Sequence, residues 1–358
     1  MKNVFAALRL AALFVGSVVG AGFATGQEIV LFFDGGSVVN LIVAAAFMGF
    51  MCFVFAELGA AGAVRSPKGA LALDTLVTVC SFAVYVAMIA AAEEVLAGLF
   101  STVGLSLFIA LFSAAVSVKN IGWISRPNVV AVPLMAVIIV LVGHGGGTVG
   151  GAFHGVRSLA YGAMNLLFSG ALLYKEGAGT ARKARVLAGV IGGVVIFVML
   201  LFMHFSVQGS AVQEMPFLAA AEGAGLGVLV PIALLLAIVT TMTSCNYLAA
   251  DKLLACTGDK CLSLALPLLA GVLLANFGFS AIVNAVYPVV SCLGLVVTAA
   301  AIALWIFMQR KSDKRRGSCP RSARAGKLKP ERPLRPSKGE TPIHGLLQTN
   351  SRKPRKKH

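Results

Sequence analysis

The sequence predicts an all-α membrane protein with many transmembrane helices, and two observations support this class. Hydrophobic residues make up 58% of the 358 residues, whereas charged residues make up only 12%. Apolar runs long enough to cross a bilayer recur at nearly regular intervals from Val4 to Met308. No small-residue cleavage site ends the first run, so we expect it to be a span rather than a signal peptide.

Hydropathy and helix breakers predict ten spans. The least distinct boundary lies within 261–308, where one helix of about 48 residues would be roughly 70 Å long, more than twice the hydrocarbon thickness. We divide this stretch at Asn276-Phe277-Gly278, which supplies a turn. The expected spans are about 4–33, 37–60, 71–99, 102–118, 127–143, 152–174, 186–207, 226–250, 261–277 and 280–308.

The basic residues of the loops predict the orientation. If the N-terminus is cytoplasmic, the external loops contain only Arg157, and the cytoplasmic loops contain all the others. This asymmetry is typical of membrane proteins and places both termini in the cytoplasm. The predicted cytoplasmic residues are Arg65, Lys68, Lys119, Arg126, Lys175, Arg182, Lys183, Arg185, Lys252 and Lys260.

The composition divides the chain at about residue 309. The net charge of the whole chain is +16. Residues 310–358 carry +14 of this charge, because they hold 17 of the 30 Lys and Arg residues and 3 of the 14 Asp and Glu residues. We expect residues 1–309 to form the transmembrane domain and 310–358 to be a disordered cytoplasmic tail. Anionic lipids are the expected partner of such a tail. Nucleic acid is not expected because no aromatic residues are interleaved, and a tail without any role stays an alternative.

The first span contains "VGSVVGAGFATGQEI", Val15 to Ile29, which carries four glycines. Glycines four residues apart, as at Gly16 and Gly20, allow close helix packing. The alternative is an unwound segment at Gly20 to Gly26, whose free amides face an anion and whose free carbonyls bind a cation. The glycine density, the length of the span and the following Glu28 favour the unwound segment.

The stretch "GSVVGAGFATGQEIVLFF" resembles the first helix of the YkvI-like membrane proteins. That group is similar to the amino-acid/polyamine/cation (APC) transporter superfamily, whose members have the LeuT-type fold. The resemblance implies an inverted repeat of five plus five helices, over about 4–143 and 152–308, with helices 1 and 6 broken around a central site. In span 6, "LAYGAMNLLFSGALL" carries Gly162, Asn165, Ser169 and Gly170 at the corresponding place.

The expected substrate site lies at these two breaks. Amides of the first break would hold a carboxylate, span 6 would close the site, and Glu28 or Glu93 would meet an ammonium or carry a proton. Glu94, about 100° further round the helix, is assigned to the external interface. The candidate substrate-binding residues are Gly20, Ala21, Gly22, Thr25, Gly26, Glu28, Glu93, Tyr161 and Asn165.

Span 8 contains "TTMTSCNY", Thr240 to Tyr247. Such hydroxyls commonly bond to carbonyls of their own helix, but hydroxyl and carbonyl oxygens also bind hard cations. The resemblance implies a sodium site joining helices 1 and 8, which many relatives replace by a proton or a fixed charge. Carried over by position, its ligands are Gly16, Val19, Thr240, Thr243 and Ser244.

Further polar residues have two explanations each. Glu57 and Asp74 are expected to form helix-end or gate ion pairs with Arg65 or Lys68. Polar residues of spans 8 and 10 line the pathway or form interhelical hydrogen bonds; they are Asn246, Tyr247, Asn284 and Tyr287. The loop 208–225 forms either a short helix over the external face, which would suit an outer lid, or an unstructured loop.

We therefore expect a secondary active transporter that moves a small polar solute, an amino acid or related amine, coupled to Na⁺ or H⁺. The bacterial plasma (inner) membrane is the expected location. A non-transporting sensor or scaffold, which uses the pocket for recognition and the tail for binding lipid or a partner, is the alternative. An enzyme is not expected because the spans hold no nucleophile–base pair, and the seven cysteines form no CxxC motif. No cofactor besides the coupling ion is predicted, and the sequence does not indicate an oligomeric state.

Overall fold

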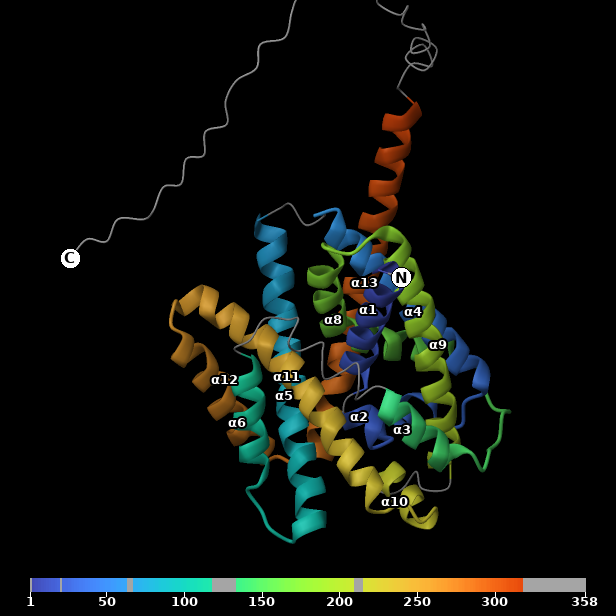
Figure 1. Ribbon diagram of the computed structural model, residues 1–358, viewed down its shortest axis with the longest axis vertical. Coiled ribbons are helices and arrows are strands. Elements are labelled where there is room, and N and C mark those ends of the chain that lie inside the picture. The colour runs from blue at the N-terminus through green and yellow to red at the C-terminus, as the bar shows by residue number, and fades with distance from the viewer. Residues whose placement is uncertain (1, 20, 63–66, 118–132, 209–214, 318–358) are drawn as a thin grey trace, which may run out of the picture. The chain divides into compact units, whose positions relative to one another are not determined.

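The computed structural model describes residues 2–19, 21–62, 67–117, 133–208 and 215–317, which are almost entirely helical (Figure 1). A short apolar helix, Pro133–Gly143, lies between α6 and α8 in the chain. The other helices are α1 (Lys2–Val18), α2 (Ala21–Ala24), α3 (Gln27–Phe33), α4 (Val38–Ala60), α5 (Pro67–Phe100), α6 (Ser106–Ser117), α8 (Gly155–Gly177), α9 (Arg182–Val207), α10 (Pro216–Gly223), α11 (Leu229–Thr257), α12 (Lys260–Ala275) and α13 (Phe279–Gly317).

Five of the described helices are long and apolar enough to cross a membrane by themselves, and the bent helix α8 would be a sixth. The helices α6, Pro133–Gly143 and α12 are apolar but shorter. The described structure therefore agrees with an integral membrane protein, and the count of ten spans stays a prediction. The five long spans are α4, Thr75–Phe100 of α5, α9, α11 and Phe279–Lys311 of α13.

Two boundaries test the sequence directly. The division within 261–308 is confirmed, because α12 ends at Ala275 and α13 begins at Phe279. The first residues of the predicted tail are helical. Residues 310–317, which we expected to be disordered, continue helix α13, and residues 318–358 lie outside the described part. The chain divides into units of residues 1–309 and 310–358.

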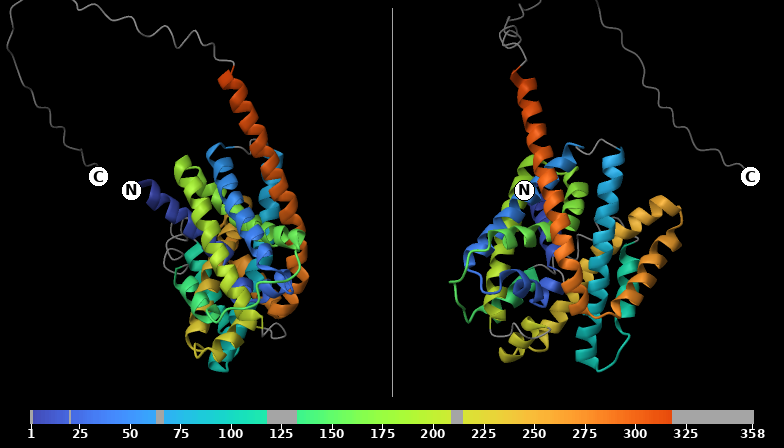
Figure 2. Two further views of the ribbon diagram at one scale, coloured as in Figure 1. Left: turned by 90° about the vertical axis from the view of Figure 1, so that its right-hand side faces the viewer. Right: turned by 180° about the vertical axis from the view of Figure 1, so that it is seen from behind.

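The helices of the first unit pack as two groups. Helices α1, α4, α8 and α9 make most of their contacts with one another, and so do α5, α6, α11 and α12. In Figure 1, α6 and α12 lie at the left and α4 and α9 at the right, and the rear view in Figure 2 shows the same separation. The contacts between the groups run mainly through α1 and α2 against α11, and through α8 and α2 against α5. We call them the α4/α9 group and the α5/α11 group.

Candidate functional site

The first predicted span is broken, as the sequence indicated. Helix α1 ends at Val18, a single turn of helix follows as α2, and α3 begins at Gln27. Gly26 joins α2 to α3 with φ +84°, a left-handed conformation that glycine adopts without strain. Gly20 lies outside the described residues. The interruption of the first predicted span is thus confirmed, and its depth in the membrane and its role in binding stay predictions.

Helix α10 contacts the chain between α2 and α3. The backbone N–H of Phe217 donates a hydrogen bond to the Thr25 carbonyl at 2.9 Å. A short helix is therefore present in the predicted external loop, and it contacts the break itself. The backbone N–H of Gly26 donates to the Phe23 carbonyl at 3.0 Å, and that of Gln27 contacts the Thr25 hydroxyl at 3.4 Å. These two amides already have partners within the chain.

Helix α8 bends at the place where the sequence predicted a second interruption. The axis of Ser169–Gly177 is bent by 56° from the axis of Gly155–Leu167. The Ser169 hydroxyl donates to the Asn165 carbonyl at 2.6 Å, and the Asn165 side-chain amide donates to the Tyr161 carbonyl at 3.1 Å. Asn165, placed just before the bend, is therefore available to groups outside its own helix through its side-chain oxygen and second N–H.

Glu28 of α3 forms the centre of a buried polar cluster. Its carboxylate makes side-chain hydrogen bonds with Asn165 of α8 and with Tyr287 of α13. All three residues are at most 4% exposed. They border a cavity of about 10 Å³, together with Val18, Val84, Met88, Met164 and Thr241. This is space for about one water molecule, so a solute requires these helices to separate.

Gly22 is required by the close approach of Glu28. A Cβ atom at this position would lie 2.3 Å from Glu28 Oε1 and 2.7 Å from the Tyr287 hydroxyl. Neither distance is compatible with van der Waals contact. The contact therefore explains why position 22 is glycine: α2 passes the Glu28 carboxylate so closely that an added Cβ would displace it.

Two buried polar atoms of the cluster have no hydrogen-bond partner in the described structure. They are Glu28 Oε2 and the hydroxyl oxygen of Tyr161. Tyr161 is fully buried and packs edge-on against the rings of Phe32 and Phe33, with centroids 5.6 and 5.0 Å away. It also lies close enough to Glu28 for the two groups to interact electrostatically. Since buried polar atoms normally have partners, both atoms indicate a place for a ligand.

The contact between α1 and α11 is made by Thr241, which corrects the predicted set. The Thr241 hydroxyl lies 3.4 Å from the Gly16 carbonyl oxygen and 3.2 Å from that of Val19. The hydroxyls of the three predicted residues instead donate to carbonyls within α11. Thr240 donates to Ala237, Thr243 to Val239 and Ser244 to Thr240. Because a residue advances about 100° round a helix, an error of one position turns a side chain away.

The structure places Glu93 outside the cluster. Its carboxylate accepts hydrogen bonds from the backbone N–H groups of Gly104 and Ser106, at the N-terminus of α6. Met88 faces the central cavity, and Glu93, five residues later, points about 140° away from it round the helix. Glu94 accepts a hydrogen bond of 3.1 Å from the N–H of Phe279, where α13 begins. Both glutamates therefore cap helices, and Glu28 is the carboxylate that borders the central cavity.

Two larger cavities differ in chemistry from the central one. A cavity of about 620 Å³ between α4 and α9 has an almost wholly apolar lining, which includes Ile42, Phe50 and Phe197, so it offers little to orient a polar solute. Another, of about 310 Å³, is bordered by Asp34 and His204. Ile29 and Val30 of α3 also line this second cavity, whereas Glu28 lines the central one. Helix α3 therefore stands between them.

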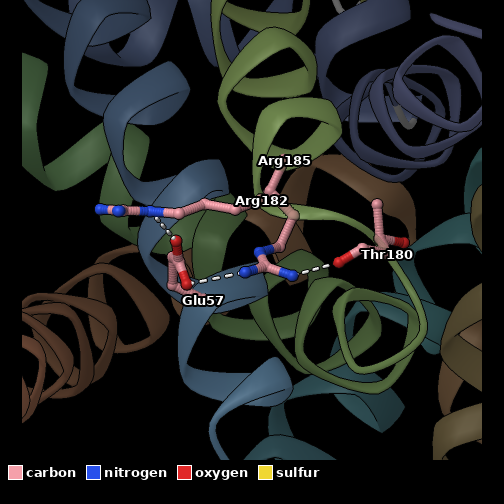
Figure 3. Close-up of polar contacts among 4 residues, drawn as sticks. All are labelled: Glu57, Thr180, Arg182 and Arg185. Atoms are coloured by element: carbon pink, nitrogen blue, oxygen red, sulfur yellow. Dashed lines mark hydrogen bonds and ion pairs between the residues drawn. The ribbon is translucent and has the colours of Figure 1, made fainter. Parts of the chain in front are cut away.

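Ion pairs join the helices beside the turn between α8 and α9. Glu57 pairs with Arg182 and Arg185, each at 2.9 Å, and Arg185 also donates to the Thr180 carbonyl (Figure 3). The partners expected from the sequence were Arg65 or Lys68. Arg65 and the side chains of Lys68 and Asp74 lie outside what the structure describes, so the prediction for Asp74 is not tested. Among the described residues, Glu57 pairs with α9, and its predicted pairing with Arg65 or Lys68 is not tested either.

Two further ion pairs lie at this end of the unit. Arg9 of α1 pairs with Glu176 of α8, within the α4/α9 group. Lys175 pairs with Asp251 of α11 at 2.5 Å, and its ammonium lies 5.1 Å from the centre of the Tyr247 ring. The second pair connects the two helix groups.

Two polar residues of the last spans were assigned only generally from the sequence. The Asn246 side-chain amide of α11 donates an interhelical hydrogen bond of 3.0 Å to the Ser117 hydroxyl of α6. Tyr287 instead enters the central cluster. Its position one residue before Pro288, inside an apolar helix, was the available sequence signal.

Comparisons with known proteins support the fold. No model of a known protein family matches the sequence, and no curated protein matches it significantly. Three solved structures resemble the chain at low identity. Mhp1, a nucleobase-cation-symport-1 family transporter in a closed conformation with bromovinylhydantoin bound, has a TM-score of 0.54 at 17% identity, over 79% of this chain and 76% of that one.

The inward-facing conformation of Mhp1 has a TM-score of 0.54 at 16% identity, covering 84% of this chain and 75% of that one. MhsT in complex with L-phenylalanine has a TM-score of 0.52 at 15% identity, covering 85% of this chain and 88% of that one. The chain is similar in structure to these LeuT-type transporters. The similarity agrees with the LeuT-type fold that the sequence implied, and at this identity it concerns the fold alone.

Proposed function

We propose that the protein is a secondary active transporter that moves a small polar solute, an amino acid or related amine, by alternating access. The observation that carries this proposal is the buried cluster of Glu28, Asn165 and Tyr287. It lies where one helix is broken and another is bent, which is where membrane transporters place substrate sites. Backbone irregularities at membrane depth persist because they line such a site.

The arrangement of helices supports alternating access. The central cavity is lined from both groups, by Glu28 and Asn165 on one side and by Val84, Met88 and Thr241 on the other. Movement of the α4/α9 group against the α5/α11 group would therefore open the site. Helix α10, whose Phe217 N–H is hydrogen-bonded to the Thr25 carbonyl, would act as the outer lid. The resemblance to Mhp1 and MhsT supports the same interpretation.

The coupling ion is proposed to be Na⁺ or H⁺. For Na⁺, the hydroxyl of Thr241 lies 3.4 Å from the carbonyl oxygen of Gly16 and 3.2 Å from that of Val19. The Thr240 hydroxyl and the Ala237 carbonyl lie on the same helix as Thr241. Oxygen ligands of this kind suit a hard cation. For H⁺, the buried carboxyl of Glu28 is the candidate carrier.

The test is solute uptake by purified protein in liposomes, with an imposed Na⁺ gradient, an imposed proton gradient or neither. We expect concentrative uptake of at least one amino acid or amine with one gradient, which an ionophore that removes that gradient abolishes. A variant that lacks residues 312–358 is expected to transport equally well. If neither gradient drives uptake of any solute, or if removal of the tail abolishes it, the sensor or scaffold alternative is favoured.

A further inference from the structure

The charge of the central site limits the solutes that fit there. Among the described residues that line the cavity, Glu28 is the one charged side chain. Its hydrogen-bond partners, Asn165 and Tyr287, are neutral. A buried carboxylate is costly in free energy unless it meets a positive charge, and hydrogen bonds to neutral groups offset only part of this cost.

The position of Glu28 also bears on where a solute carboxylate would lie. Sequence reasoning assigned that carboxylate to the amides between Gly20 and Gly26. The structure brings the protein's own carboxylate to this segment, since Glu28 Oε1 lies only 2.3 Å from the place that a Cβ of Gly22 would take. A second carboxylate at this place would be repelled by Glu28, because like charges a few ångströms apart in a low dielectric destabilise each other strongly.

Two unpaired acceptor atoms belong to side chains that interact electrostatically with each other. Glu28 Oε2 and the Tyr161 hydroxyl oxygen are both buried and both lack a partner among the described residues. An ammonium group has three N–H donors, which is more than enough to supply these two oxygens. An amine therefore provides the missing hydrogen bonds and the missing positive charge together.

From these contacts we infer that the central site selects organic amines without a carboxylate, and that Glu28 is the residue that determines this specificity. The inference rests on the proposed transport function, because it names the class of solute for the same site. The amine pairs with Glu28 Oε2 and the Tyr161 hydroxyl, while Asn165 and Tyr287 hold Glu28 Oε1. Amino acids, whose carboxylate would lie beside Glu28, bind more weakly than the corresponding amines.

Matched pairs of ligands test the inference by binding alone. Tyramine is compared with tyrosine, cadaverine with lysine, and putrescine with ornithine, because each pair differs only in the carboxylate. Binding is measured on the detergent-solubilised full-length protein by thermal shift and calorimetry. We expect that at least one amine binds, with a Kd at least tenfold lower than that of its amino acid.

Variants assign the preference to one residue. Glu28→Gln keeps the size of the side chain and removes its charge, so we expect it to abolish the preference, and Tyr161→Phe is expected to weaken amine binding severalfold. Glu222→Gln is the control for loss of an acidic residue, because Glu222 is exposed on α10. If Glu28→Gln does not fold, Glu28→Asp, which keeps the charge, is expected to retain the preference for amines with a changed affinity.

The outcomes separate the specificity from the transport function. Stronger binding of the amino acid in the pairs, an unchanged preference in Glu28→Gln, or a lack of response to every amine overturns the inference. So does a loss of the preference in Glu93→Gln instead of Glu28→Gln. Gradient-driven uptake of amino acids in preference to amines would overturn the specificity and leave the transporter intact. Glu28-dependent amine binding without any uptake would overturn the transport function and leave the specificity intact.

Discussion

The hydroxyl oxygen of Thr241 lies 3.2 Å from the carbonyl oxygen of Val19, at the point where α1 ends. Because Thr241 belongs to α11, this contact connects the broken helix with the α5/α11 group. Val19 is 3% exposed and Thr241 is 1% exposed, so water does not compete for these oxygens. A cation held here would depend on the relative position of the two groups of helices, as coupling requires.

Replacing Thr241 with valine is expected to raise the Na⁺ concentration for half-maximal uptake about tenfold or more, because an oxygen ligand is exchanged for a methyl group of the same size. The measurement is uptake at varied Na⁺ in liposomes. Thr298→Val is the control, since the Thr298 hydroxyl donates to the Gly294 carbonyl within α13. Unchanged Na⁺ dependence in Thr241→Val would show that Na⁺ binds elsewhere, whereas uptake that does not depend on Na⁺ even in the parent protein would leave the proton at Glu28 as the candidate coupling ion.

Gly22→Ala is expected to displace the Glu28 carboxylate, because the added Cβ would lie 2.3 Å from Glu28 Oε1. Overpacking of this kind costs about 1–3 kcal/mol, so ligand affinity should fall by about tenfold or more. Calorimetry with the best amine of the matched pairs checks this. In the control Gly98→Ala, the added Cβ meets no atom within 4 Å, so binding should be unchanged. Equal affinities in the two variants would contradict the assigned role of Gly22.

Sequence reasoning predicted the irregular helices correctly where it depended on helix breakers. Glycine density predicted the break between α1 and α3, and Asn165 marked the bend in α8. These signals are local, since they depend on the backbone preferences of a few neighbouring residues. A predicted transmembrane segment that contains several such residues near its middle therefore indicates where a helix is interrupted, without knowledge of its neighbours.

The side chains that complete the site were harder to predict, because they depend on how helices rotate and pair. Thr241 differs from Thr240 by one residue, and thus by about 100° round the helix. Glu93 was predicted to face the interior, but its carboxylate accepts a hydrogen bond from the backbone N–H of Ser106, at the start of α6. Similarly, the pairing of Glu57 with two arginines of α9 depends on which helices become neighbours. A single sequence does not record these neighbours.

The two arginines that pair with Glu57 are expected to contribute unequally to stability. The Arg182 side chain is 66% exposed, so Arg182→Ala should lower the free energy of unfolding by at most about 1 kcal/mol. The Arg185 side chain is 9% exposed and also bonds to the Thr180 carbonyl, so Arg185→Ala should cost about 1.5–3 kcal/mol. Unfolding of the purified variants by denaturant measures both. Equal losses would show that burial does not distinguish the two pairs.

The ion pair between Lys175 and Asp251 should report on the movement of the two groups rather than on stability. Both side chains are partly exposed, 35% and 49%, so breaking the pair should change the free energy of unfolding by less than about 1 kcal/mol. Because the pair joins α8 to α11, a covalent link at the same place should hold the groups in this conformation. We expect Lys175→Cys with Asp251→Cys, joined by a short thiol-reactive linker that a reductant cleaves, to lose uptake and to recover it after reduction.

This crosslinking experiment needs a background without competing thiols. The described exposed cysteines are Cys256, Cys261 and Cys292, and they would be replaced by serine together with Cys319 of the tail. The matched control joins Arg9→Cys to Glu176→Cys, whose parent residues form an ion pair within the α4/α9 group. Since that link lies inside one group, uptake should continue. Loss of uptake in the control as well, or continued uptake with the Lys175–Asp251 link complete, would show that the two groups are not the moving parts.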